Sequence, residues 1–192
     1  MTPELDLAME RGSTDATPQV LKIRSAGIDA IILNLYEAET AIFLRDAAKY
    51  GLSLPVVSGY ATDLENTLKR VGGVGPVKNY HVLHMFVGTL DSPEMAKWGA
   101  IIKKYYPNEE LTGFSFVGLG SAIATVEALK RAGRDLTREK FIAEMDKLRD
   151  FKTGVLAGPV TFTPQDHQGA KTSAVATFVR FPPAVMSAAV TV

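Results

Sequence analysis

Apolar and polar residues follow two different spacings along the first half of the chain. Four stretches place apolar residues on one helical face, at residues 17–26, 37–50, 62–71 and 93–106. Short apolar runs bounded by turn residues, which are typical of buried strands, lie at residues 29–35, 54–58 and 79–87. Helices that alternate with short buried strands predict an α/β fold with a parallel sheet.

The second half of the chain breaks this alternation. The pattern here predicts two consecutive helices, at residues 114–132 and 137–148. It then predicts two strands, at residues 155–162 and 170–180. The small residues of 184–192 predict a frayed tail or a stray strand. Two adjacent helices do not continue a doubly wound sheet, and three parallel strands are few for a complete ligand crevice. We therefore expect this sequence to be part of something larger.

Composition excludes several classes of protein. The 21 basic and 21 acidic residues cancel, so no field of one sign is available to attract a nucleic acid. No apolar run approaches the ~20 residues that cross a bilayer, so no membrane-spanning segment is expected. The absence of cysteine excludes a disulfide scaffold, a thiolate zinc site and a cysteine nucleophile. Residues 1–11 lack the pattern of a signal peptide, so an export signal would have to lie outside this sequence.

The glycine motifs do not complete a nucleotide site. Residues 118–123 (GLGSAI) resemble a dinucleotide-binding turn, but Ile123 stands where the third small residue would be. Residues 72–75 (GGVG) lack the Lys-Ser/Thr pair of a phosphate-binding loop. The first motif is therefore expected to be a helix with small residues on a packed face. A nucleotide-binding enzyme fragment is the alternative.

The histidines and serines also give no catalytic or metal pattern. His81 and His84 are three residues apart on a predicted strand, so they point to opposite faces of the sheet. His167 lies in a polar turn, and no serine occupies a G-x-S-x-G motif. We expect no enzyme activity, no metal and no cofactor.

Four aromatic residues are the remaining candidates for a site. Tyr36 and Tyr60 directly follow two predicted strands, at the sheet edge where open α/β folds bind ligands. A tyrosine there either contacts a small amphipathic molecule or caps the strand end, and spacing does not separate the two interpretations. Phe114 and Phe116 begin a predicted helix, and the pattern alone favours the core for both.

Taken in order, these segments resemble the C-terminal half of the type I periplasmic solute-binding proteins of ABC importers, in the branched-chain amino acid receptor group. The resemblance covers residues 12–181. It is carried by the stretches TPQVLKIRSAGIDAIILNLY (17–36), FLRDAAKYGL (43–52), PVVSGY (55–60), GFSFVGLGSAIATVEALKRAG (113–133) and VLAGPVTFTPQDHQG (155–169).

The resemblance implies an incomplete two-lobe protein, because members of the group are about twice as long. Residues 1–110 would form most of the second lobe, as its parallel-sheet α/β part. Residues 111–150 would be a helical segment of the first lobe, and residues 151–192 the closing strands and the C-terminal tail. The missing part would hold most of the first lobe.

The resemblance also implies a binding site. Tyr36 matches a ligand-contacting tyrosine, and Phe114 or Phe116 matches an aromatic residue that lines the cleft from the first lobe. Tyr60 matches a position where amino acid receptors often carry an acid that pairs with the ligand's ammonium. The implied ligand is thus an amino acid, an aromatic or aliphatic carboxylate, or an amide.

The role implied by the resemblance is that of a periplasmic or extracellular solute receptor whose closed form is read by an ABC permease. A ligand-sensing regulatory module on the same fold is an alternative, because transport and sensing would use the same cleft. A homodimer through the surface left by the missing lobe is left open.

Overall fold

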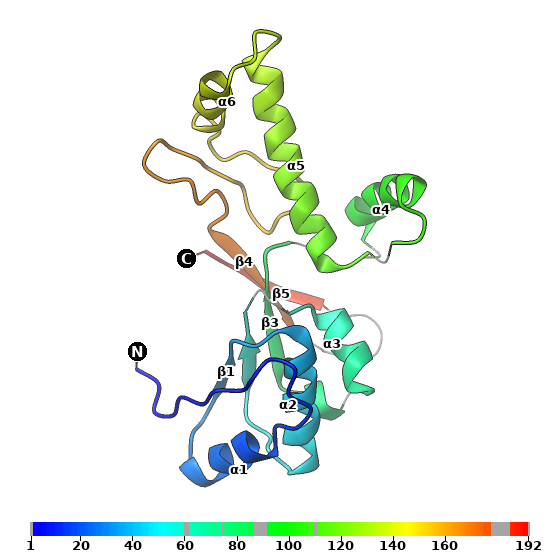
Figure 1. The fold of residues 1–192 in the computed structure, drawn as a ribbon, viewed down its shortest axis with the longest axis vertical. Coiled ribbons are helices and arrows are strands. Elements are labelled where there is room, and N and C mark those ends of the chain that lie inside the picture. Colours follow the sequence, from blue (N-terminus) through cyan, green and yellow to red (C-terminus); the bar gives the residue numbers. More distant parts are fainter. Residues whose placement is uncertain are drawn as a thin grey trace. The chain divides into compact units, whose positions relative to one another are not determined.

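The computed structural model describes residues 2–59, 62–73, 75–86, 92–109, 111–177 and 185–191. The chain divides into two compact units (Figure 1). The first comprises Met1–Leu83 and Val175–Ser187, and the second comprises His84–Ala174 and Ala188–Val192. The assignment of residues 1–110, 111–150 and 151–192 to parts of a longer two-lobe protein stays a prediction.

The strands form one five-stranded sheet in the order β1-β2-β3-β4-β5. Their bounds are Ile31–Leu33 (β1), Val56–Ser58 (β2), Tyr80–His84 (β3), Thr172–Thr177 (β4) and Val185–Thr191 (β5). β1 pairs with β2, and β2 with β3, in parallel, so that Ile31 lies opposite Val56 and Val56 opposite Tyr80. This confirms the predicted α/β fold with a parallel-dominated sheet. β5 also shows that part of the C-terminal tail forms a strand.

Three helices accompany the parallel strands of the first unit: α1 (Thr17–Ala26), α2 (Glu37–Lys49) and α3 (Leu64–Val71). Proline in its first turn and Gly27 at φ 68° delimit α1. Asp63 caps α3 by accepting a hydrogen bond from the backbone N–H of Asn66 at 3.1 Å. α2 packs against both α1 and α3.

The core of the first unit lies between these helices and the sheet. Its members are apolar side chains from the predicted periodic positions of the helices and strands. They include Val20, Ile23, Ile31, Leu33, Phe43, Leu44, Val56, Leu64, Tyr80 and Val82. Because parallel strands are usually covered on both faces, it is notable that Ile32, the middle residue of β1, is 80% exposed.

The second unit contains α4 (Pro93–Tyr105), α5 (Gly113–Ala132) and α6 (Arg138–Met145), and α5 packs against α6 (Figure 1). A Cβ atom at Gly120 would lie 2.6 Å from Cγ of Leu156, whereas Gly118 has open space around it. Gly120 therefore allows the close approach of α5 to the loop that follows α6 and contains Leu156. The prediction that the GLGSAI segment is helical is confirmed, and Gly120 is its buried small residue, whereas Gly118, Ser121 and Ala122 are exposed.

The predicted strand at residues 155–162 is wrong. The structure has only isolated bridges there, including Phe86 with Leu156 and Val160 with both Phe151 and Ala170. Proline at position 159 cannot donate a hydrogen bond to a ladder. A Cβ atom at Gly158 would also lie 2.5 Å from Thr172. The apolar run is thus an irregular packed loop rather than a strand.

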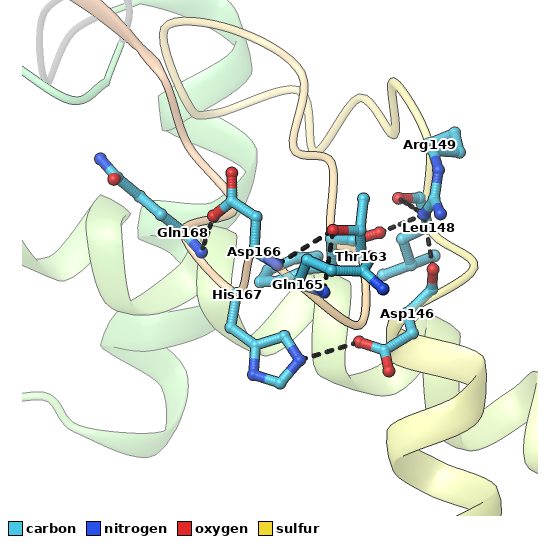
Figure 2. Close-up of polar contacts among 9 residues, drawn as sticks. Asp146, Leu148, Arg149, Thr163, Gln165, Asp166, His167 and Gln168 are labelled. Atoms are coloured by element: carbon cyan, nitrogen blue, oxygen red, sulfur yellow. Dashed lines mark hydrogen bonds and ion pairs between the residues drawn. The ribbon is translucent and has the colours of Figure 1, made fainter.

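The polar turn at residues 163–169 is fixed to the end of α6. Nε2 of His167 lies 3.1 Å from Oδ1 of Asp146 (Figure 2). The guanidinium of Arg149 donates to the carbonyl oxygens of Asp146 (2.5 Å), Leu148 (3.1 Å) and Phe162. These contacts are structural, because they join the end of α6 to a turn that Thr163 and Asp166 close with two backbone hydrogen bonds.

Candidate ligand-binding site

The carboxyl ends of β1 and β2 lie at the same edge of the sheet, since Leu33 is opposite Ser58 in the parallel register. The loop after β1 leads directly to Tyr36, which is the N-cap residue of α2 and accepts the N–H of Thr40 at 2.9 Å. The Tyr36 side chain is 58% exposed. An exposed aromatic side chain therefore lies where open α/β sheets bind ligands.

The Tyr36 ring is partly covered by Arg11. The Cζ atom of Arg11 lies 4.8 Å from the ring centroid, within the range of a cation–π interaction. Next to it, the backbone N–H of Gly12 donates to Oε1 of Glu39 at 2.7 Å. This hydrogen bond, with a smaller contribution from the charge of Arg11, lowers the pKa of the Glu39 carboxyl.

Behind the sheet edge lies a buried set of hydroxyl groups. The Oγ atom of Ser58 is 2.6 Å from the Tyr80 hydroxyl and 2.6 Å from Oγ1 of Thr62. Thr62 in turn donates to the carbonyl of Gly59 at 3.0 Å. Burial raises the pKa of Tyr80, so its hydroxyl stays neutral at physiological pH. A buried network of hydrogen-bonded hydroxyl groups such as this one rigidifies the carboxyl ends of β2 and β3.

Glu37, the first residue of α2, adds a carboxyl group beside Tyr36. Burial raises its pKa, and the nearby charge of Asp63 raises it further, while Arg70 and Lys69 act in the opposite direction. The Nε atom of Arg70 lies 3.9 Å from Oε1 of Glu37. That oxygen is buried, and within the described part of the chain it accepts no hydrogen bond.

The two phenylalanines have different environments. Phe116 is 1% exposed, and its ring centroid lies 6.4 Å from that of Phe86 in a cluster with Met95 and Val155. Phe114, in the first turn of α5, is 47% exposed. The core position expected from the pattern is thus confirmed for Phe116 and wrong for Phe114. The role of either residue in ligand binding stays a prediction.

Tyr60 lies outside the described residues. Tyr36 and Phe114 belong to different compact units and are described separately. Sequence reasoning did not single out Arg11 or Glu37. The sequence does point to Glu37 as a site candidate, since it follows Tyr36 at the start of a helix. Arg11 is 25 positions away from Tyr36, and no local pattern links the two residues.

Histidines and acids do not gather into a metal site in the described part of the chain. Nδ1 of His81 lies 2.8 Å from Oγ1 of Thr177, and His84 stacks on Phe86 with ring centroids 4.4 Å apart. Among the helices that the structure describes, none has the length and apolar character needed to cross a membrane.

Comparison with known families gives one match. The family model described as "periplasmic binding protein" matches residues 6–180. No curated protein was matched.

Solved structures give matches along nearly the whole chain. A leucine-binding protein from Thermotoga maritima is 21% identical with a TM-score of 0.73, over 95% of this chain and 50% of its own. A branched-chain amino acid ABC transporter structure from Thermus thermophilus with bound valine is 20% identical with a TM-score of 0.80. The match covers 94% of this chain and 50% of that structure's chain.

A third similar structure is described as binding a different class of solute. It is a fatty acid ABC transporter substrate-binding protein from Thermomonospora curvata, 22% identical with a TM-score of 0.76, over 93% of this chain and 47% of its own. At these identities the likeness concerns the fold. The chain spans about half the length of the solved structures that it matches.

Proposed function

Because the chain belongs to the periplasmic binding protein family, we propose that it supplies part of a two-lobe cleft that binds a small solute for an ABC importer. The observation that carries this proposal is the place of Tyr36. Its side chain is 58% exposed at the carboxyl end of β1, in a fold whose similar structures are described as solute-binding proteins.

The ligand proposed is a small amino acid-like molecule, a carboxylate or an amide. Structures of similar fold are described with valine and with fatty acids, so this fold is used for ligands with and without an ammonium group. Tyr36 offers a flat apolar face and a hydroxyl group, which suit an amphipathic ligand. Tyr60 and Phe114 are the further residues that we propose to line the cleft.

Such a receptor works by closing its two lobes on the ligand. A ligand favours the closed form only if it binds that form more tightly than the open form. Both lobes must therefore contact the ligand. No bond is made or broken, and the proposed role is not enzymatic. This chain, which spans half the length of the similar structures, should therefore bind its ligand weakly by itself.

The proposed role places the protein in the periplasm or outside the cell, with an ABC permease as its partner. The permease would read the closed, liganded form. Both points follow from family membership and from the ABC transporter proteins among the similar structures.

A thermal-shift screen tests the proposal. The chain is heated with millimolar amino acids, aromatic and aliphatic carboxylates, and the matching amides. A ligand at about ten times its Kd adds about 1.4 kcal/mol to the free energy of unfolding. In a chain of this size that raises Tm by a few degrees. A shift that Tyr36→Ala leaves unchanged would contradict the proposal, because the ligand would then bind away from the carboxyl end of β1.

A further inference from the structure

Arg11 lies over one face of the Tyr36 ring, and Tyr36 is still 58% exposed, which leaves room for a ligand on the ring. The guanidinium carbon lies 4.8 Å from the ring centroid, and both side chains are exposed. A ligand that stacks on Tyr36 therefore meets a ring whose other face already holds a positive charge. Arg11 thus influences which ligand group the free face accepts.

The chain holds Arg11 in this place through a built turn. On one side, the backbone N–H of Gly12 donates to Glu39 on α2 at 2.7 Å. On the other side, the N–H and the hydroxyl of Ser13 donate to the carbonyl of Glu10 at 3.1 and 2.6 Å. Gly12 has φ of 82°, a conformation that costs other residues strain. The backbone that carries Arg11 is thus fixed against the start of α2.

We propose that Arg11 is a specificity-determining residue, which disfavours ligands that place a positive charge on Tyr36 and so favours carboxylates and amides. This rests on the proposed function, in which Tyr36 contacts the ligand. A group stacked on the free face lies about 4.5 Å from the ring centroid, so its distance from Arg11 is about 9 Å. At about 9 Å, two like charges lower an affinity about twofold in water, and more where water is excluded.

The carboxylate of Glu39 reduces this effect, because it is ionised and close enough for the charge of Arg11 to help lower its pKa. Its side chain is buried, and one carboxylate oxygen already accepts the N–H of Gly12. Arg11, by contrast, lies on the exposed ring. Valine and fatty acids, the solutes named for two similar structures, differ in whether they carry an ammonium group. In this proposal Arg11 contributes to the discrimination between these two classes.

The test uses three probes that share a phenyl ring and differ in charge: phenylacetate, phenylacetamide and phenethylamine. Each is titrated into the 192-residue chain at millimolar concentration, and NMR follows the Tyr36 ring and the amides of residues 34–40. Wild-type protein should bind phenylacetate and phenylacetamide more tightly than phenethylamine. In Arg11→Gln, phenethylamine should gain two- to fivefold relative to phenylacetate.

Two further variants separate local from general effects. Arg24→Gln removes the same charge from the last turn of α1, at the amino end of β1, and should leave the ratio of affinities unchanged. Arg11→Lys keeps the charge and should keep the wild-type preference. In the free protein, the side-chain protons of Arg11 should show an upfield ring-current shift that Tyr36→Leu removes.

The outcomes distinguish this inference from the proposed function. An unchanged ratio in Arg11→Gln, together with weaker binding of all three probes to Tyr36→Ala, overturns the role of Arg11 alone. Binding that Tyr36→Ala leaves unchanged overturns the proposed function as well. The absence of saturable shifts with all three probes overturns the inference about Arg11. Circular dichroism and urea unfolding establish that each variant is folded.

Discussion

The hydroxyl of Tyr80 on β3 lies 2.6 Å from Oγ of Ser58 on β2, and both side chains are fully buried. Tyr80→Phe keeps the ring but leaves Ser58 with one partner fewer. The free energy of unfolding should fall by about 1–2 kcal/mol, because a buried polar group loses a hydrogen bond. Urea unfolding measures it. Tyr105→Phe, at a 68% exposed position on α4, is the control; equal effects of both changes would contradict a buried network.

Gly118 and Gly120, two of the glycines of α5, give a matched pair. Alanine at either position gains the same helix propensity, about 1 kcal/mol over glycine. Only at Gly120 does the new methyl group meet Leu156, at 2.6 Å, while Gly118 has open space. Gly120→Ala should therefore be less stable than Gly118→Ala by about 1–3 kcal/mol, the usual cost of overpacking. Two variants of equal thermal stability would show that α5 does not approach the loop this closely.

Glu37 should make stability depend on pH. Burial raises its pKa above the ordinary value of 4.5, so the folded protein binds this proton more tightly than the unfolded chain does. Below pH 4.5, Glu37 is protonated in both the folded and the unfolded state, so it does not lower the stability. As pH rises through the raised pKa, the folded state must ionise a buried carboxyl, and stability falls.

The matching variant is Glu37→Gln, which removes the ionisation. Its stability relative to wild type should rise as pH goes from below 4.5 to neutral, as measured by urea unfolding at each pH. Glu109→Gln, at an exposed position, supplies the control. A variant that loses stability at neutral pH relative to acid would mean that the ion pair with Arg70 outweighs burial.

Local patterns predicted the fold well where one segment decides its own structure. The predicted helices 17–26 and 93–106 agree with the structure to within a residue, because proline in the first turn and Gly27 or Pro107 just after the end mark them. The strand at 155–162 failed because its apolar residues pack irregularly. Gly158 lies close to Thr172, and Gly120 lies close to Leu156. These contacts join residues too far apart in sequence for a local pattern to predict them.

The candidate site was predictable only in part. Tyr36 could be found because it follows a strand, and the structure places it exposed at the strand's carboxyl end. Phe114 and Phe116 are two residues apart in one helix, and only tertiary packing decides that Phe116 is buried and Phe114 exposed. Arg11 reaches Tyr36 through the turn at Gly12, which the chain order does not reveal.

The most direct measurement is the Kd of Tyr36→Ala for a solute found in the thermal screen, set beside wild type. Loss of an aromatic anchor that the bound ligand covers should weaken binding by about 1–3 kcal/mol, which is roughly 5- to 150-fold. Tyr105→Ala, which removes an exposed tyrosine from α4, should bind as wild type does. A Kd that is the same in all three proteins would contradict a ligand site at the carboxyl end of β1.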